Sequence, residues 1–339
     1  MKNVFLVLSA AVMILVSCSK QNDRVGLFVY NETDPYMQSF AGQIMAESDG
    51  KFPIHLYYAK NSQVIQNEQI EKELENNPRL LMINPVDRLG SYSIIKTMKE
   101  KNIPIIFFNR EPLAEDLALW DKIYYVGAKA AQSGQLQAKL VMDLFGNNPY
   151  KLNEMDRNND GKIQLIILKG EQGHQDAETR TSEVLKSFEE HNFSIDLVAI
   201  EVANWNFNEA SLKTLKLIQK FHDEVELIIS NNDDMALGAI QTLREEGFLS
   251  DTNNDGYVNK YDDQWIPVVG IDGLEEAQTA IEAGFLYGTV KNNSKKMTEV
   301  MIELSLLLME KKDVSELSEP LADGKYIWID YSPYILEDK

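Results

Sequence analysis

The feature that most constrains the fold of this chain is the repeated alternation of short, unbroken apolar runs with longer amphipathic segments. Runs such as 25–30, 80–84 and 227–230 are as long as β-strands and contain few polar residues, which is typical of strands that are buried on both faces. The segments between them, for example 62–75, have the length of helices. Strands that alternate with helices in this way predict an α/β fold built on parallel sheets.

The pattern continues along the whole chain. The other predicted strands are residues 54–59, 105–109, 124–127, 163–168, 197–202, 268–272 and 286–290. The other predicted helices are residues 37–47, 89–101, 132–145, 178–190, 210–221, 235–246, 274–283 and 295–310. So many βα units exceed the usual width of one open sheet, and the length of the chain suits two domains. We therefore expect two doubly wound parallel-sheet lobes.

The amino terminus has the features of a secretory signal. Met1 and Lys2 are followed by the apolar run 4–16 and then by Ser17 and Cys18, and this run is too short for a comfortable membrane span. The sequence Leu-Val-Ser-Cys that ends at Cys18 resembles a bacterial lipobox, in which the signal is cut before the Cys and lipid is attached to its sulfur. Since Cys18 is the only cysteine, an internal disulfide is impossible and an anchor would account for the thiol. The alternative is an incidental cysteine in an ordinary signal peptide.

The charge and the missing motifs exclude several functional classes. The formal net charge of −20 disfavours nucleic acid, because phosphate binding needs Lys and Arg. The sequence contains no Gly-rich phosphate loop, no Gly-x-Ser-x-Gly elbow and no His-Glu-x-x-His zinc motif. No apolar run after the leader is long enough to span a bilayer. We therefore expect a binding protein rather than an enzyme, a DNA-binding regulator or a permease.

Isolated polar residues recur directly after predicted strands. They are Asp34, Asn109, Asn232, Asp272 and Asn292, and Tyr36 follows close after Asp34. One Asn or Asp after a strand is usually a helix cap or a turn former. In doubly wound sheets, however, ligands bind beyond the carboxyl ends of the strands. The repetition at equivalent positions therefore favours a ligand site.

Four segments carry a family resemblance. They are PIIFFNREP at 104–112, LKGEQGHQDAETR at 168–180, SNNDDMALG at 230–238 and GID at 270–272. From about Val25 onward the chain resembles the galactose/glucose-binding proteins of bacterial ABC transport and chemotaxis, which have the type I periplasmic-binding-protein fold. The resemblance implies capture of a hexose between two hinged lobes, without a chemical step, and delivery to an ABC permease. A sugar-sensing module for a membrane receptor or histidine kinase is the alternative.

The resemblance also implies a binding site. Its hydrogen-bonding residues would be Asp34, Asn109, His174, Asp176, Arg180, Asn232, Asp272 and Asn292. Two aromatic residues would sandwich the sugar ring: Trp205, and Tyr36 where the family usually has Phe. Sugar hydroxyls both donate and accept, so they suit Asp, Asn and Arg partners, and aromatic rings cover the C–H faces of a pyranose.

Taken one at a time, several of these residues have structural alternatives. Trp205 could be a core residue that covers a helix end, and His174 could be an ordinary loop histidine. Asp176 and Arg180 are four residues apart and could form a solvated ion pair on a helix.

The connectivity that the resemblance implies divides the chain into lobes. One lobe would hold residues 24–128 and 293–325, and the other 129–292 and 326–339. Residues 1–17 would be the signal peptide and 18–23 a tether. We expect an exported monomer that is held by its lipid on the outer face of the cytoplasmic membrane, or a periplasmic one.

An Asx-rich segment predicts a calcium site. Residues 156–164 follow the first nine positions of an EF-hand loop, with Gly161 at the turn. The oxygen ligands would be Asp156, Asn158, Asp160, Gln164 and the backbone carbonyl of Lys162. The twelfth position is Ile167, which cannot ligate, and the resemblance implies that the remote Glu226 completes the shell. The alternative is a polar turn without a metal.

A second segment of this kind covers residues 251–262, in an insertion relative to the family. The oxygen ligands would be Asp251, Asn253, Asp255, Asn259, Asp262 and the backbone carbonyl of Tyr257. Because Asp262 stands where an EF-hand has a longer Glu, we expect weaker binding here. The alternative is a solvated surface loop.

Overall fold

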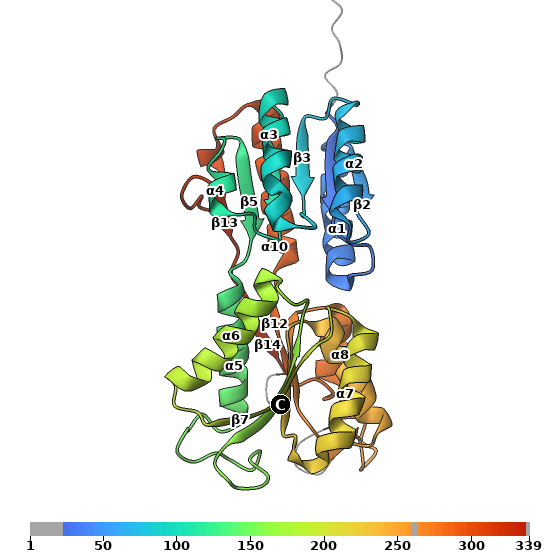
Figure 1. Ribbon diagram of the computed structural model, residues 1–339, viewed down its shortest axis with the longest axis vertical. Helices are drawn as coiled ribbons and strands as arrows, with labels where there is room; N and C mark the ends of the chain where they lie inside the picture. The colour runs from blue at the N-terminus through green and yellow to red at the C-terminus, as the bar shows by residue number, and fades with distance from the viewer. Residues whose placement is uncertain (1–22, 259–263, 337–339) are drawn as a thin grey trace, which may run out of the picture.

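The computed structural model describes residues 23–258 and 264–336, which fold into two α/β lobes joined end to end (Figure 1). Cys18 and two of the ligands expected in the second Asx-rich loop, Asn259 and Asp262, lie outside these residues. Each lobe contains a six-stranded sheet with helices on both faces. The predicted fold class of two doubly wound lobes is confirmed.

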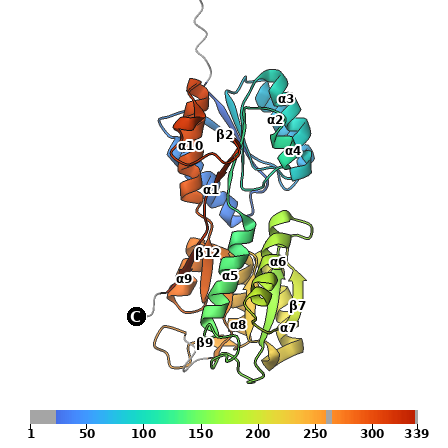
Figure 2. The ribbon, with the colours of Figure 1, turned by 90° about the vertical axis from the view of Figure 1, so that its left-hand side faces the viewer.

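The sheet of the amino-terminal lobe has the strand order β13-β5-β4-β3-β1-β2, and its strands run parallel. The strands are β1 (Val25–Val29), β2 (Ile54–Tyr58), β3 (Leu80–Ile83), β4 (Ile105–Phe108), β5 (Ile123–Gly127) and β13 (Tyr326–Trp328). The helices are α1 (Pro35–Ser48), α2 (Gln63–Leu74), α3 (Ser91–Lys101), α4 (Ala114–Leu117) and α10 (Ser294–Glu310), with 3-10 turns η1 (Arg88–Gly90) and η3 (Val314–Glu316). Helices α1 and α10 cover one face of the sheet, and α2 and α3 cover the other (Figure 2).

The sheet of the carboxy-terminal lobe has the order β14-β12-β11-β8-β6-β7, and only its edge strand β14 is antiparallel. The strands are β6 (Ile163–Lys169), β7 (Ile195–Val202), β8 (Leu227–Ser230), β11 (Val268–Asp272), β12 (Gly288–Lys291) and β14 (Ser332–Ile335). The helices are α5 (Ala130–Leu144), α6 (Gln175–Glu190), α7 (Phe207–Phe221), α8 (Asp233–Glu245) and α9 (Glu275–Glu282), with the 3-10 turn η2 (His222–Glu224). A separate two-stranded antiparallel sheet, β9 (Leu249–Ser250) and β10 (Gln264–Trp265), flanks the second Asx-rich loop.

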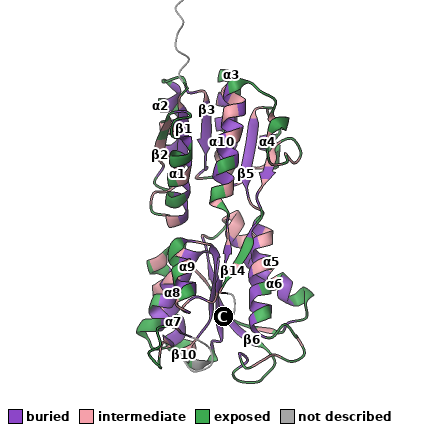
Figure 3. Cartoon of the chain, turned by 180° about the vertical axis from the view of Figure 1, so that it is seen from behind, coloured by how far each residue is buried: buried purple, intermediate pink, exposed green. Residues whose placement is uncertain are grey.

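The central apolar runs are buried because helices cover both faces of each sheet, as the sequence predicts. In β3, Leu80 and Met82 pack in the core under α1 and α10, whereas Leu81 and Ile83 pack in the core under α2 and α3. A strand with helices on both sides has no face toward water, so every residue of this run is apolar. The burial map shows the same arrangement in both lobes, with buried strands inside helices that expose their outer faces (Figure 3).

Both sheets reverse their strand order at an equivalent point. Strand β1 lies between β2 and β3, and β6 lies between β7 and β8. In doubly wound folds the ligand crevice forms beside such a reversal, at the carboxyl ends of the strands. The loops that leave β1 and β6 meet between the two lobes, which is where a site is expected.

The predicted boundary between the lobes at residue 326 is wrong, because the last crossing of the chain comes a few residues later. The prediction assigned residues 326–339 to the carboxy-terminal lobe, but Tyr326–Trp328 forms the edge strand β13 of the amino-terminal sheet. The chain crosses at 329–331, and only Ser332–Ile335 joins the second sheet. These strands have three and four residues, and Pro333 interrupts the second one, so neither has a recognisable apolar pattern. In the described part of the chain, no helix combines the length and the apolar character that a membrane span requires.

Candidate functional site

A small cavity of about 40 Å³ lies between the lobes, and both lobes line it. Nine of the ten residues predicted from the sequence meet there: Asp34, Tyr36, Asn109, His174, Asp176, Arg180, Trp205, Asn232 and Asp272. The tenth, Asn292, lines an adjoining cavity together with Tyr36 and Asp272. Tyr30 and Arg110 also line the central cavity. The fold therefore brings together side chains from segments that are far apart in the sequence.

Asp34 combines a structural role with a place in the cavity wall. It is the N-cap of α1, where its Oδ1 accepts a hydrogen bond from the backbone N–H of Met37 at 3.1 Å. Its Oδ2 accepts one from the hydroxyl of Tyr30 at 2.6 Å. The capping interpretation of Asp34 is thus correct, and it leaves the carboxylate at the edge of the cavity with spare acceptor capacity.

Asn109 ends β4 in a left-handed conformation, with φ of 61°. Its side-chain oxygen accepts a hydrogen bond from Nδ2 of Asn84 at 3.2 Å, and its backbone carbonyl accepts one from the hydroxyl of Tyr125 at 2.8 Å. Both oxygens of Asn109 thus accept a hydrogen bond within the amino-terminal lobe. Its side-chain N–H groups are left to donate into the cavity.

His174 is the N-cap of α6 and is not a free loop residue. Its Nδ1 accepts a hydrogen bond from the backbone N–H of Asp176 at 3.2 Å. Burial, together with the nearby charge of Arg110, lowers the pKa of His174 to about 4. The ring is therefore neutral near pH 7 and carries its proton on Nε2, as a donor to the cavity.

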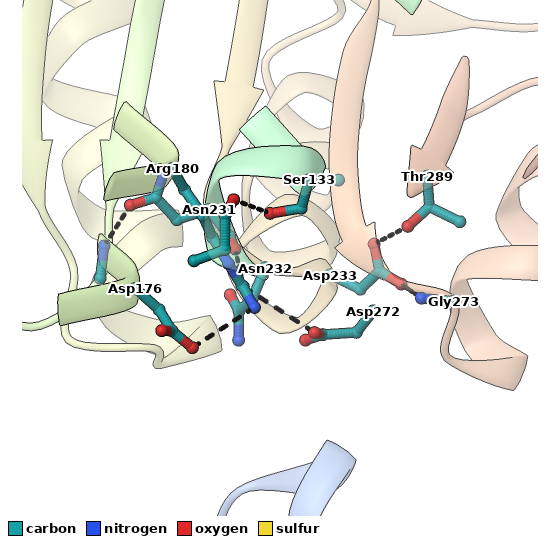
Figure 4. Close-up of polar contacts among 12 residues, drawn as sticks. Ser133, Asp176, Arg180, Asn231, Asn232, Asp233, Asp272, Gly273 and Thr289 are labelled. Carbon is teal, nitrogen blue, oxygen red and sulfur yellow. Dashed lines mark hydrogen bonds and ion pairs between the residues drawn. The ribbon is translucent and has the colours of Figure 1, made fainter. Parts of the chain in front are cut away.

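Arg180 is the most deeply buried charge of the cavity, with 4% of the residue exposed. Figure 4 shows its guanidinium between Asp176 and Asp272. Its guanidinium donates to the carbonyl of Asn231 at 2.6 Å and to the hydroxyl of Tyr331 at 3.1 Å. Asp176 and Asp272 lie 3.8 and 3.9 Å from it. Burial alone would lower the pKa of Arg180, but Tyr331 and the two carboxylates raise it above its ordinary value. This is a buried ion network, not the solvated surface pair that the spacing alone allowed.

Asp272 is held in a strained conformation at the end of β11. Its φ of 130° lies in a region that residues other than Gly rarely adopt. Asn292 fixes it on one side, because the Asn292 N–H donates to the Asp272 carbonyl at 2.9 Å. Burial raises the pKa of Asp272 well above its usual range, although Arg180 opposes this shift.

Asp233 fixes Asp272 on the other side and was not among the predicted residues. It is fully buried and accepts hydrogen bonds from the N–H groups of Gly273 and Leu274 at 2.7 and 2.9 Å and from the hydroxyl of Thr289 at 2.7 Å. A side chain at Gly270 would lie 2.1 Å from its Oδ1, so that position must remain glycine. Asp233 therefore clamps the turn that aims Asp272 at the cavity.

Trp205 covers the end of β6 and faces the other cavity residues of its lobe. A Cβ at Gly170 would lie 2.2 Å from the indole, so the absence of a side chain there lets the ring lie against the strand end. The ring meets His174 edge to face at 5.3 Å between centroids, and the guanidinium of Arg180 lies 5.7 Å from it. Trp205 is only partly buried, so part of its face is available to a ligand.

Among the residues predicted for the site, three buried polar atoms have no hydrogen-bond partner. They are the hydroxyl of Tyr36, Oδ1 of Asn292 and Nε of Arg180, in residues that are 7%, 5% and 4% exposed. A buried polar atom without a partner costs roughly 1–3 kcal/mol. Atoms of this kind in a cleft indicate a polar ligand that would satisfy them.

Arg110 and Tyr30 form a stacked pair in the amino-terminal wall. The guanidinium lies 3.7 Å from the centroid of the Tyr30 ring and donates to the carbonyl of Val86 at 2.7 Å. Arg110 stands inside the segment PIIFFNREP, which carries part of the family resemblance but predicts no role for this residue. Its placement depends on Tyr30 and Val86, which follow β1 and β3 and which the sequence alone does not pair with it.

The first Asx-rich loop has its oxygen atoms curled inward. The two side-chain oxygens of Asp156 accept from the N–H groups of Asp160 and Gly161 at 3.2 and 2.9 Å. Glu226, 2% exposed, lies against this loop and accepts from the N–H of Arg157 at 2.6 Å. The structure thus brings the remote Glu226 to the predicted loop.

The second loop repeats this geometry in its described part. Asp251 accepts from the N–H groups of Asp255 and Gly256 at 3.1 and 2.8 Å, as Asp156 does at the equivalent positions of the first loop. In the same loop, the side-chain oxygen of Asn253 accepts from the backbone N–H of Asp255 at 2.8 Å. A side-chain oxygen of Asp255 accepts from the backbone N–H of Tyr257 at 2.9 Å. In the described residues no group of three or more His, Cys, Asp or Glu side chains is arranged to hold a metal. A cation in either loop would therefore depend on amide and backbone oxygens as well.

Comparison with known proteins gives one consistent result. A family model described as a periplasmic binding protein domain matches residues 25–313. The D-galactose/methyl-galactoside binding periplasmic protein MglB of Haemophilus influenzae is 32% identical over 321 residues, which cover 94% of this chain and 90% of that protein.

Solved structures agree with this chain in fold. An ABC transporter periplasmic solute binding protein from Actinobacillus succinogenes with bound D-allose superposes with a TM-score of 0.75 at 20% identity, over 92% of this chain and 97% of that one. An ABC transporter solute binding protein from Bacillus halodurans with bound myo-inositol superposes with a TM-score of 0.74 at 23% identity, over 94% and 96%.

Proposed function

Because this chain belongs to the periplasmic binding protein family, we propose that it captures a hexose of the galactose or glucose type between its lobes and delivers it to an ABC permease. It is a binding protein and not an enzyme, in keeping with the binding proteins that it is similar to. The observation that carries the proposal is the composition of the central cavity. Three aromatic residues there, Tyr30, Tyr36 and Trp205, accompany a dense set of hydrogen-bond donors and acceptors.

The donors and acceptors suit an uncharged, hydroxyl-rich ligand. Asn109 and His174 have N–H groups left to donate, and Asp34 has acceptor capacity left. Three carboxylates and two guanidiniums line the cavity, so their charges nearly cancel and an anionic ligand gains little. Each sugar hydroxyl donates one hydrogen bond and accepts others, and charge-assisted bonds to Asp and Arg are about twice as strong as neutral ones.

The aromatic residues suit the same ligand. Trp205 on the carboxy-terminal wall and Tyr36 on the amino-terminal wall are the rings available to cover the C–H faces of a pyranose. The 32% identity to a protein named for D-galactose and methyl-galactoside supports a hexose in this place.

Binding requires the lobes to move. A site for one water needs about 10–15 Å³, so the central volume of about 40 Å³ holds roughly three waters, whereas a hexose has roughly a dozen heavy atoms. The lobes must therefore separate for the sugar to enter. Contacts that the sugar makes with both walls then favour the closed arrangement, since a ligand shifts a conformational equilibrium by its difference in affinity for the two states.

Calorimetric titration of the purified exported protein tests this function. We expect one-to-one binding of galactose or glucose, weaker binding of ribose, and a ranking of methyl galactoside that reports on the space around the ring. Circular dichroism on the same sample checks that it is folded. If folded protein binds none of these sugars, the hexose assignment is wrong and only the fold stands.

We further propose a structural calcium ion in the loop at residues 156–164, held by the predicted oxygens and Glu226. Oε1 of Gln164 is buried without a hydrogen-bond partner, as expected of an atom reserved for a ligand. Burial raises the pKa of Glu226, and neighbouring Asp156 adds to this shift, so a cation would relieve repulsion there. The ion would tie the loop to β8. Chelation should lower the melting temperature, and Glu226→Gln should remove most of that response.

The matching turn at 251–257 supports a second, weaker calcium ion as a separate proposal. Asp251→Asn should then reduce the calcium stoichiometry from two to one without affecting the first site. An unchanged stoichiometry would mean that this segment is a surface loop.

From the lipobox-like sequence at the amino terminus, we propose that Cys18 is lipidated and holds the protein at the outer face of the cytoplasmic membrane. Mass spectrometry of the exported protein should detect acylation at Cys18, and Cys18→Ser should release it from the membrane fraction.

A further inference from the structure

A second cavity of about 320 Å³ adjoins the central one, on the side of His174. The two cavities share Arg110, His174 and Asp176 in their walls. At about 10–15 Å³ per water, this volume holds more than a dozen heavy atoms, which is enough for a unit as large as a hexose. We call it the side cavity.

The side cavity is built by both lobes where they already touch. Gln175, the first residue of α6, donates from Nε2 to Oε2 of Glu111 in the other lobe at 3.3 Å. Both residues line the side cavity. The space beside them therefore exists with the lobes in contact at this edge, and is not simply a gap between lobes that stand apart.

The wall of the side cavity is polar but not anion-binding. Its charged residues are Asp87, Arg88, Arg110, Glu111, Glu171 and Asp176, so four carboxyl groups oppose two guanidiniums. This excess of acidic groups disfavours a phosphate, sulfate or carboxylate. Amide side chains of Asn61, Gln172 and Gln175 add donors and acceptors of both kinds.

The side cavity is also poorly suited to an apolar substituent. Among the described residues, Val86 is the one aliphatic side chain in its lining, and no Phe, Tyr or Trp belongs to that lining. Apolar ligand groups are usually bound by mainly hydrophobic and aromatic walls. The chemistry that fits is neutral and rich in hydroxyl groups.

Resting on the function proposed above, we propose that the ligand is a hexose that carries a neutral, hydroxylated substituent, such as a second sugar. Once the lobes have parted far enough to admit the sugar, the hexose occupies the central cavity and the substituent occupies the side cavity. His174, Asp176 and Arg110 then surround the linkage between the two units, because these residues line both cavities.

The proposal is tested by titrating the purified exported protein with galactose, methyl galactoside, melibiose, lactose and maltose. We expect at least one of the three disaccharides to bind as tightly as the best monosaccharide or more tightly. If the monosaccharides bind and no disaccharide does, this inference is overturned while the proposed function stands. If no sugar of either kind binds to folded protein, the proposed function fails and this inference with it.

A double variant locates the second unit. Asp87→Trp and Gln172→Trp together place two large rings in the side cavity, one from each lobe, at positions that are exposed and do not line the central cavity. We expect disaccharide affinity to fall at least about tenfold and monosaccharide affinity to stay within about threefold. Ser182→Trp, on the exposed surface of α6, is the matched control. Equal effects on both classes of sugar would contradict a separate place for the substituent.

Discussion

The two walls of the cleft reach a similar polarity by different means. In the carboxy-terminal wall, charged side chains contact each other across elements: Arg180 of α6 lies within 4 Å of Asp176 and of Asp272 at the end of β11. In the amino-terminal wall of the central cavity, polar groups are tied to uncharged neighbours, as Asp34 is to Tyr30 and Asn109 to Asn84. From this difference we expect the carboxy-terminal wall to supply most of the binding free energy and the amino-terminal wall mainly to enclose the ligand.

The strongest test of this difference is Arg180→Met. The substitution leaves Asp176 and Asp272 without their shared cation, and breaking a buried ion pair costs about 3–5 kcal/mol. We expect sugar affinity to fall by about a thousandfold or more, with a lower melting temperature. The measurement is calorimetric titration together with thermal unfolding.

Arg180→Lys is the companion variant, because it keeps the charge but not the planar fork. It should recover stability better than affinity. An affinity of Arg180→Met within tenfold of the wild type would show that the ion network is structural and does not hold the ligand.

The next test is Trp205→Ala, which removes the ring of the same wall. Loss of a ring that stacks on a sugar face removes both its buried area and its specific aromatic contact, together about 2–3 kcal/mol, or roughly a hundredfold in affinity. Because Trp205 is only partly buried, the melting temperature should change little. Unchanged affinity would contradict its assignment to the site.

On the amino-terminal wall we expect a smaller effect from Asn109→Ala. The variant removes one neutral donor, worth about 1 kcal/mol, so affinity should fall about fivefold to tenfold. Asn84→Ala is a useful comparison, since Asn84 holds the side chain of Asn109 without lining the central cavity. A loss from Asn109→Ala as large as that from Arg180→Met would mean that the two walls contribute equally.

The strands of the two sheets differ in how far the sequence predicts them. The unbroken apolar runs predict the central strands such as β3, β4 and β8, because burial on both faces leaves little room for polar residues. The edge strands Tyr326–Trp328 and Ser332–Ile335 escape prediction, because they are too short for a pattern and their sheets lie in different lobes. The last crossing between the lobes is therefore the boundary that the sequence places wrongly.

The sequence predicts cavity residues that end a strand or lie in one of the four segments that carry the family resemblance. It does not predict residues that only position another residue of the site. Asp233 reads as an ordinary acidic residue in the first turn of a helix, where negative charge is favourable anyway. Its function comes from Gly273, Leu274 and Thr289, which are some 40 to 56 positions away in the sequence. Only the folded chain shows that it aims Asp272.

The smallest effect that we predict concerns pH, and it separates the neutral donor His174 from the charged network beside it. The pKa of His174 is about 4, so the ring stays neutral from about pH 8 down to about pH 5.5, and its protonation should change sugar affinity by less than about twofold across that range. Titrations at several pH values, with His174→Gln as the control, measure this.

Stability responds differently, and the sign follows from linkage. Between about pH 6.5 and pH 4 the unfolded chain binds a proton at His174 that the folded chain does not, so the free energy of unfolding must fall as the pH falls. Relative to His174→Gln, which lacks this group, the wild type should lose about 2–3 kcal/mol over that interval. The difference between the two proteins cancels the opposing contributions of Asp233 and Asp272, whose pKa values burial raises. A difference that stays constant with pH would show that His174 is accessible to protons in the folded protein, and it could then not be the fixed neutral donor of the carboxy-terminal wall.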